Sequence, residues 1–293
     1  MIEIRSGKDC DAPLEKALWR QVFGDTDEYI QCYFDTCYAP EDMMLLLEGS
    51  RLASMLICLP VEIKMPTGFR PPNGEAHGSY IYALATAPDA RGKGYAHRLL
   101  EFTHAHLRER GQTFSVTVPA MDSLFDFFQS AGLSPYFVHQ QQQLTREVLP
   151  QAAGYAEPCD AAAYHHARST FAFHQPSIAY PHAHILWQRQ VSQLANADLY
   201  RITGNAVGYA AAERTDADTV TLKELLLENG DVLQAVAVLS VVLPAHTYVV
   251  RTPAHADGLT DGVRRFGSIA WYDDMAARAV EAFPYGYLGL GFD

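Results

Sequence analysis

Six residues carry the strongest signal in this sequence: Arg91-Gly92-Lys93-Gly94-Tyr95-Ala96. They follow residues 79–85, which read as a strand, and they open a run with helical apolar spacing. Gly92 and Gly94 leave the backbone N–H groups uncovered, and the start of the next helix adds unpaired donors and a positive dipole end. We expect this loop to bind an anion, and a diphosphate suits it best.

Two common glycine-rich patterns do not fit this loop. The Walker pattern needs Gly-Lys followed by Ser or Thr, and the dinucleotide fingerprint needs a third, widely spaced glycine. Arg91, Gly94 and Ala96 instead stand in the spacing Arg/Gln-x-x-Gly-x-Gly/Ala. With the strand before it and the helix after it, this region resembles the acetyl-CoA site of the GCN5-related N-acetyltransferases (GNAT).

The resemblance implies acetyl-CoA as co-substrate, bound at residues 91–96. It also implies that the backbone of Leu84 and Thr86 pairs with the pantetheine arm. Residues 112–118 read as the next strand, and residues 122–133 resemble the family's following helix with its terminating glycine. In that helix the resemblance places Ser123 and Phe128 near the coenzyme.

The catalytic residues are less well marked than the coenzyme loop. GNAT members usually carry Tyr four residues before the helix-terminating Gly132, where it protonates the leaving thiolate, but this sequence has Phe128, which has no proton to give. Tyr136 is a candidate replacement acid. No carboxylate stands early in the preceding strand to act as base, so Tyr80 is the candidate there, with aromatic packing as the alternative role.

Composition excludes several other classes of function. A net charge of −12 without a long run of cations argues against nucleic-acid binding. Five cysteines without paired metal-type spacing, and a start that lacks the order of a signal peptide, predict reduced thiols in the cytoplasm. The longest apolar runs are too short to cross a membrane, and the twelve histidines lack the i, i+4 spacing of a helical metal site, so we expect no metal.

The length of 293 residues favours two domains, and the halves show a similar order of elements. Each half reads as two helices, a hairpin, a strand and a central helix. We predict an α/β (α+β) fold of two tandem acetyltransferase-like units, each a mixed, mostly antiparallel sheet flanked by helices. The predicted domains are residues 1–149, which bind acetyl-CoA, and residues 155–293, which form a degenerate copy.

The second half lacks the features of the coenzyme loop. Residues 227–231 are fewer and carry Glu228 and Asp231, whose charges would repel a diphosphate. Tandem arrangements of this kind resemble the enhanced-intracellular-survival acetyltransferases, whose further lipid-carrier-like domain has no counterpart in this sequence.

The resulting hypothesis is an N-acetyltransferase that moves an acetyl group from acetyl-CoA to a primary amine by direct attack. The alternative is a non-catalytic acyl-CoA-binding or regulatory module on the same fold, which the loss of the acid at Phe128 would permit. The sequence leaves open the identity of the amine, the acid and base, and the oligomeric state.

Overall fold

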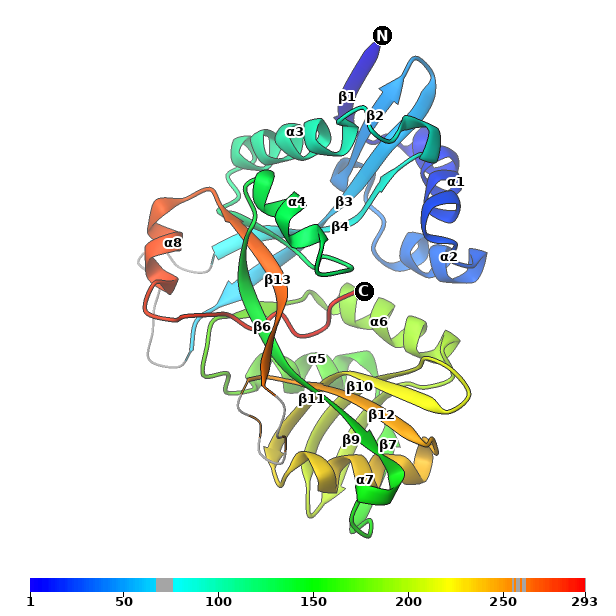
Figure 1. The fold of residues 1–293 in the computed structure, drawn as a ribbon, viewed down its shortest axis with the longest axis vertical. Coiled ribbons are helices and arrows are strands. Elements are labelled where there is room, and N and C mark those ends of the chain that lie inside the picture. The colour runs from blue at the N-terminus through cyan, green and yellow to red at the C-terminus, as the bar shows by residue number, and fades with distance from the viewer. Residues whose placement is uncertain (67–75, 255, 257–258, 260–261, 293) are drawn as a thin grey trace. The chain divides into compact units, whose positions relative to one another are not determined.

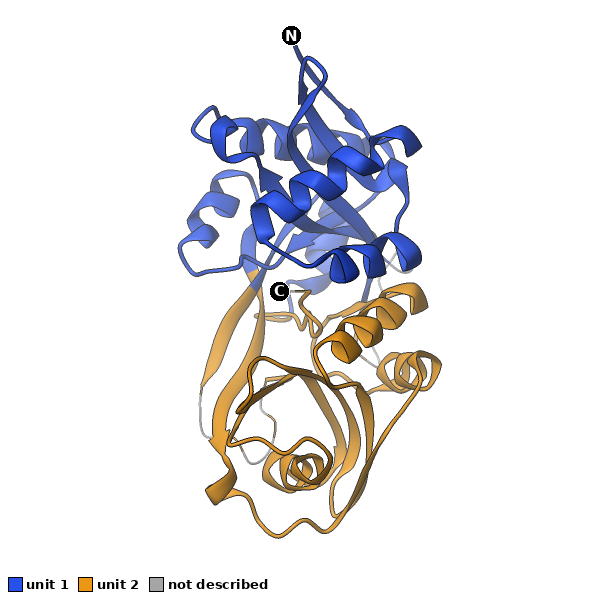
Figure 2. Cartoon of the chain, turned by 90° about the vertical axis from the view of Figure 1, so that its right-hand side faces the viewer, with its two compact units in different colours: residues 1–63, 70–135, 267–282 blue, residues 64–69, 136–266, 283–293 orange. Residues whose placement is uncertain are grey.

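The computed structural model describes residues 1–66, 76–254, 256, 259 and 262–292. The chain divides into two compact units, and each unit is built from three separate stretches of the sequence (Figure 2). Unit 1 comprises Met1–Ile63, Arg70–Pro135 and Gly267–Ala282, and unit 2 comprises Lys64–Phe69, Tyr136–Phe266 and Phe283–Asp293.

Unit 1 is a mixed sheet flanked by helices (Figure 1). Its strand order is β1 (Ile2–Ser6), β2 (Met43–Glu48), β3 (Arg51–Lys64), β4 (Ala76–Thr86), β5 (Phe114–Thr117) and the end of β13 (Val263–Trp271). Only β4 and β5 pair in parallel, and the other neighbours with a described register pair antiparallel. The helices are α1 (Ala12–Phe23), α2 (Asp27–Thr36), α3 (Tyr95–Glu109), α4 (Leu124–Ser130) and α8 (Asp274–Val280).

Local sequence explains the turn between the first two helices. Gly24 takes a φ of 75° and ends α1 with its N–H bonded to Arg20 O, because glycine adopts the left-handed region without a Cβ penalty. Thr26 then starts α2, and its hydroxyl accepts a hydrogen bond from Tyr29 N at 3.2 Å. This turn fixes where the side chains at the start of α2 meet the sheet.

Unit 2 repeats the same plan. Its strand order is β6 (Ser134–Thr145), β12 (Thr247–Thr252), β11 (Thr219–Asn229), β10 (Val207–Arg214), β9 (Leu199–Gly204) and β7 (Gly154–Pro158). Helices α5 (Ala161–Thr170) and α6 (His182–Leu194) precede the hairpin of β9 and β10, and α7 (Val232–Val242) follows β11. The apolar side of α7, including Val236 and Leu239, packs in one core with Val220, Leu222 and Val250 of the sheet.

The two units exchange a strand. β5 of unit 1 pairs antiparallel with β13, through Phe114–Trp271 to Thr117–Ser268. β12 of unit 2 pairs antiparallel with β6, which follows α4 in the chain. Each unit therefore needs a strand from the other half of the sequence to complete its sheet.

The predicted fold class is confirmed, and the differences lie in long-range pairing. The strand expected to close the first half, residues 137–144, lies in unit 2, and the strand expected at residues 267–271 lies in unit 1. Residues 287–290 do not form the expected strand, because Gly289 takes a φ of 75° and interrupts the extended backbone. β7, β8 (Ser177–Ala179) and α8 were not expected, and most of the loop expected at residues 66–78 lies outside the described residues.

Among the helices of the described ranges, none is long and apolar enough to span a bilayer.

Candidate coenzyme site

The loop that the sequence marks lies between β4 and α3, as predicted. Gly92 and Gly94 take φ values of 76° and 73°, in the left-handed region that favours glycine. A Cβ added to either would meet no atom within 4 Å in the described part of the chain. Both glycines therefore face open space, and a side chain at either position would project into it.

The start of α3 is left open to an anion. Gly94 is the N-cap residue, and no described side chain caps the helix with a hydrogen bond. The first turn of a helix has N–H groups without intrahelical partners, and the helix dipole places partial positive charge at the same end. The loop and helix thus offer a group of backbone donors of the kind that binds phosphate.

Lys93 of the loop is balanced by a carboxylate that no pattern in the sequence marks. Lys93 Nζ lies 3.0 Å from Glu48 Oε1, and Tyr95 donates to the same oxygen at 2.5 Å. Hydrogen bonds from Tyr95 and Lys93 lower the pKa of Glu48. Arg51 pairs with Asp89 at the loop's edge. Glu48 ends a strand far back in the sequence, so no local pattern reveals it.

Strand β4 parts from β5 next to this loop. The parallel ladder covers only Gly78–Phe114 to Tyr80–Val116, although β4 continues to Thr86. At Ala83, which takes a φ of 47°, the register of β4 against β3 shifts, and Tyr82, Ala83 and Leu84 are partly exposed. This stretch of β4 has backbone groups beyond the end of the ladder with β5.

The predicted backbone roles of Leu84 and Thr86 remain predictions that this geometry permits. Leu84 lies within the shifted stretch, and Thr86 closes the strand with its hydroxyl 2.9 Å from Ser54 Oγ. Arg91 Nε lies 3.4 Å from Thr86 O, which ties the first loop residue to the end of β4. The strand and the phosphate-type loop are thus joined at the place where a pantetheine arm would have to run.

The other predicted residues lie on other elements than the loop. Ser123 is exposed at the start of α4, and Phe128 is buried on that helix at 6% exposure beside Phe127. Tyr80 is buried, and its ring centroid is 6.1 Å from that of Tyr82, an arrangement that accounts for its packing role. Tyr136 belongs to unit 2, where its ring packs against Phe137 and burial raises its pKa.

Other nucleophilic and metal-binding groups are unfavourably placed. Burial raises the pKa of Cys58, raises that of Cys159 to about 12, and raises that of Cys37 to about 11, so these thiols are poor sources of thiolate. Among the described residues, no group of three His, Cys, Asp or Glu side chains is placed to hold a metal ion.

A series of hydrogen bonds among largely buried side chains connects several elements of unit 1. The Tyr272 hydroxyl lies 2.5 Å from His104 Nδ1 and 2.7 Å from Ser115 Oγ, while His104 Nε2 lies 3.1 Å from Ala131 O. Because a carbonyl can only accept, Nε2 carries the proton and Tyr272 donates to Nδ1. Burial lowers the pKa of His104 to about 4, so this histidine is neutral. Its hydrogen bonds link α3 to the end of α4 and, through Tyr272 after β13, to β5.

The matching loop of unit 2 is closed. Gly230 takes a φ of 83°, but a Cβ there would lie 2.5 Å from Asn205 O. Asp231 caps α7, and its carboxylate accepts a hydrogen bond from Gln234 N at 2.9 Å. The N-terminal N–H groups that stay open in α3 have counterparts in α7, and there the carboxylate of Asp231 accepts a hydrogen bond from one of them.

The residues of unit 1 fit the coenzyme that the loop implies. Two open glycines in the left-handed region, an N-terminus without a side-chain cap and a strand that leaves its neighbour together offer donors for a diphosphate and backbone for an amide-bearing arm.

Comparison with known proteins points to the same family. The model of the acetyltransferase (GNAT) domain matches residues 3–134. Curated protein sequences give no significant match. Among solved structures, Eis1 from Mycobacterium abscessus is similar with a TM-score of 0.67 and 13% identity, over 96% of this chain and 76% of that one.

Two further structures extend this likeness. A GCN5-related N-acetyltransferase from Anabaena variabilis has a TM-score of 0.66 at 15% identity, over 92% of this chain and 72% of that one. A tandem GNAT protein from the clavulanic acid biosynthesis pathway has a TM-score of 0.53 at 10% identity, over 92% and 98% of the two chains. At these identities the structures show the fold alone. The GNAT domain model thus matches residues 3–134, and the chain has the fold of tandem GNAT proteins.

Proposed function

We propose that this protein is an N-acetyltransferase that uses acetyl-CoA and a primary amine, with acetyl-CoA bound in unit 1. The observation that carries the proposal is the open loop at residues 91–96, joined to an α3 terminus that no described side chain caps. The bound co-substrate would supply an activated acetyl thioester. The chain's own part is to hold it, orient it and exclude water.

Each part of unit 1 has a role in this proposal. The N–H groups of the loop and of the first turn of α3 bind the diphosphate, and the backbone of Leu84 and Thr86 orients the pantetheine arm. Lys93 either leaves Glu48 to pair with the phosphate or remains paired with Glu48. In both cases the hydrogen bond from Tyr95 holds Glu48 in place. Direct attack by the amine suits a site whose nearby thiols have raised pKa values.

The leaving thiolate needs a proton donor in this reaction. Phe128 fills its place on α4 with an apolar ring and cannot act as an acid. We retain Tyr136 and Tyr80 as candidate catalytic residues, and the route of the proton as part of the proposal. The five cysteines are free, and we include a reducing location such as the cytoplasm.

Two measurements test this function. Calorimetric titration with CoA should give one site per chain, because in the described part of the chain the loop of unit 1 is open and the matching loop of unit 2 is crowded and capped. Release of free CoA thiol from acetyl-CoA should then depend on an added primary amine, and mass spectrometry should find the acetylated amine. A chain that does not bind CoA contradicts the proposal at its first step.

The buried Phe128 favours one rival function, a module that binds acyl-CoA without turning it over. This rival predicts the same single CoA site. It differs in predicting no amine-dependent thiol release across a panel of small amines and peptides, so the second measurement separates the two functions.

A further inference from the structure

The carboxylate of Glu48 collects several interactions beside the coenzyme loop of unit 1. Lys93 Nζ lies 3.0 Å from its Oε1 and 3.4 Å from its Oε2, and the Tyr95 hydroxyl donates to Oε1 at 2.5 Å. Arg51 Nη1 lies 4.0 Å from Oε2. Glu48 is the last residue of β2, so the side chains on both sides of the N-cap residue Gly94 reach the end of another strand.

Glu48 and Lys93 form an ion pair in partial contact with water. The hydrogen bonds from Tyr95 and then Lys93 lower the pKa of Glu48, and the hydrogen bond to Glu48 raises the pKa of Lys93. Both groups therefore carry their charge at neutral pH. The Glu48 side chain is 31% exposed and that of Lys93 is 44% exposed. Ion pairs with this exposure are weak, because water solvates each partner well when it is free, so Lys93 can change its partner at little cost.

Each unit has a carboxylate at the start of its central helix, but the two carboxylates have different partners. In unit 2, Asp231 accepts a hydrogen bond from the backbone N–H of Gln234 at 2.9 Å. In unit 1, Glu48 pairs with the ammonium group of Lys93, and the first turn of α3 has no hydrogen bond from a described side-chain cap. An anion that reaches the loop of unit 1 therefore meets open backbone donors beside a cation that is already paired.

Glu48 lies close enough to act on an anion that the loop binds. Lys93 and Tyr95 reach it with their own side chains, so its carboxylate is no farther from the loop backbone than an extended lysine side chain and one hydrogen bond. That separation is comparable with the Debye length of about 8 Å at physiological ionic strength, so salt screens the carboxylate only in part. A diphosphate in the loop would be repelled by Glu48 and would compete with it for Lys93.

We propose that Glu48 is a built-in competitor of the coenzyme: Lys93, which Glu48 holds in this structure, changes its partner to the diphosphate when CoA binds. This inference rests on the proposed binding of acetyl-CoA by unit 1 and adds a residue that lowers the affinity for it. Glu48 keeps the hydrogen bond from Tyr95 and the nearby charge of Arg51 after Lys93 has left. The site therefore binds CoA less tightly than its backbone donors and a free Lys93 would bind it together.

Glu48→Gln tests this competition, because the amide keeps an oxygen that can accept from Tyr95 but carries no charge. In calorimetric titration we expect this variant to bind CoA about five- to tenfold more tightly than the wild-type chain, since one partly screened negative charge beside the diphosphate is removed. The gain should shrink as the salt concentration rises, because salt screens the repulsion. If Glu48 served only to hold the start of α3 in place, the same variant would bind CoA equally or more weakly.

Glu101→Gln is the matched control for net charge. Glu101 lies farther along α3, where its carboxylate is 3.5 Å from His97 Nε2 at the surface. Its substitution removes the same charge from the same helix region and should change the affinity for CoA by less than about twofold. Equal or weaker CoA binding by Glu48→Gln, a gain that Glu101→Gln matches, or a gain that salt leaves unchanged overturns the inference.

A failure of the proposed function gives a different result from a failure of this inference. If the wild-type chain binds no CoA, inorganic pyrophosphate tests the competition at the loop by itself, because it carries the diphosphate alone. Tighter binding of pyrophosphate by Glu48→Gln than by the wild-type chain would then keep Glu48 as a competitor and reject the coenzyme. Equal binding of pyrophosphate by the two chains, or binding by neither, would reject both.

Discussion

The two units place the same elements around two different loops. In unit 1, Gly92 and Gly94 face open space and no described side chain caps α3. In unit 2, Gly230 is crowded by Asn205 O and Asp231 caps α7 with its own carboxylate. The comparison shows that a strand, a turn and a helix do not by themselves leave the backbone donors of the turn open to an anion. What matters is whether the backbone donors remain available and whether the nearest fixed charge is positive or negative.

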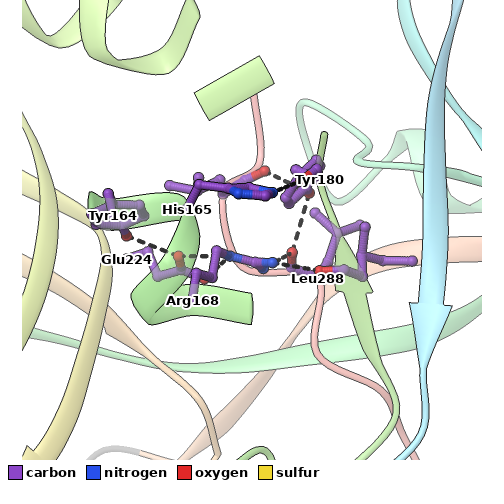
Figure 3. A network of polar contacts seen from close by, with 8 residues as sticks. Tyr164, His165, Arg168, Tyr180, Glu224 and Leu288 are labelled. Carbon is purple, nitrogen blue, oxygen red and sulfur yellow. Dashed lines mark hydrogen bonds and ion pairs between the residues drawn. The ribbon is translucent and has the colours of Figure 1, made fainter. Parts of the chain in front are cut away.

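A second difference lies on the opposite side of each sheet. Unit 1 has an aromatic contact between Trp19 and Tyr82, whereas unit 2 has a buried ion pair at the corresponding positions of α5 and β11. Arg168 also donates to the backbone carbonyls of Ile178 and Leu288 (Figure 3), and these hydrogen bonds offset part of the cost of removing its charge from water. Unit 2 therefore uses this place for stability.

The largest effect is expected from breaking that ion pair. Arg168→Leu leaves Glu224 charged and buried beside the hydroxyls of Tyr164 and Tyr287 without its ion-pair partner, and such uncompensated charges cost about 3–5 kcal/mol of unfolding free energy. Urea unfolding followed by circular dichroism measures this loss. The double variant Arg168→Leu/Glu224→Leu should lose less than the single variant. Equal or greater loss in the double variant would show that packing, rather than the unpaired charge, sets the cost.

The next effect concerns the open loop. Gly94→Val places a β-branched side chain at a φ of 73° and projects it toward the expected diphosphate, so we expect CoA affinity to fall by about 100-fold in calorimetry. Gly111→Val is the matched control, since Gly111 has a φ of 74° and equally open surroundings, but it lies after α3. Both variants carry the same backbone strain. Similar CoA affinity in the two would remove the loop from the coenzyme site.

The features behind these predictions differ in how far the sequence alone predicts them. The loop and α3 are predictable because glycine spacing and apolar periodicity act over a few residues. The exchange of β6 and β13 is not, because either strand satisfies the same period in either sheet and the choice depends on pairing across more than a hundred residues. Glu48 is hidden for a related reason, because its partners Lys93 and Tyr95 meet it only in the folded chain.

A smaller gain is expected at the missing acid. Phe128→Tyr adds one hydroxyl where the family usually has its proton donor, and a positioned acid contributes about 10²-fold at best and less if another donor already serves. Steady-state thiol release measures the change, with Tyr136→Phe as the companion variant. Loss of turnover in Tyr136→Phe with no gain in Phe128→Tyr would assign the proton to Tyr136. Unchanged turnover in both would mean that neither position supplies an acid.

The smallest effect concerns Glu15, which occupies the position in the first helix of unit 1 that Tyr164 occupies in the first helix of unit 2. Glu15 lies three residues after the start of α1, as Tyr164 does after the start of α5. Tyr164 donates to Glu224 at 2.9 Å, whereas the fully buried carboxyl of Glu15 lies beside the Tyr38 hydroxyl and forms no ion pair among the described residues. Burial raises the pKa of Glu15 from 4.5 to about 7, and the nearby Tyr38 hydroxyl opposes this only in part.

The sign of the pH dependence follows from that direction. Below pH 4.5 the carboxyl is protonated in both states, and its ionisation has no effect on stability. Between pH 4.5 and about 7 the unfolded chain releases the proton and the folded chain keeps it, so stability falls as pH rises and levels off above 7. The pKa difference sets an upper bound of about 3 kcal/mol, and structural relaxation and water entry reduce the expected loss to about 1 kcal/mol. Glu15→Gln should remove this slope in urea unfolding at pH 5 to 8, whereas Glu28→Gln on the exposed side of α2 should keep it. A slope that persists in Glu15→Gln would mean that another group titrates, and that the unpaired carboxyl of unit 1 is already ionised in the folded chain.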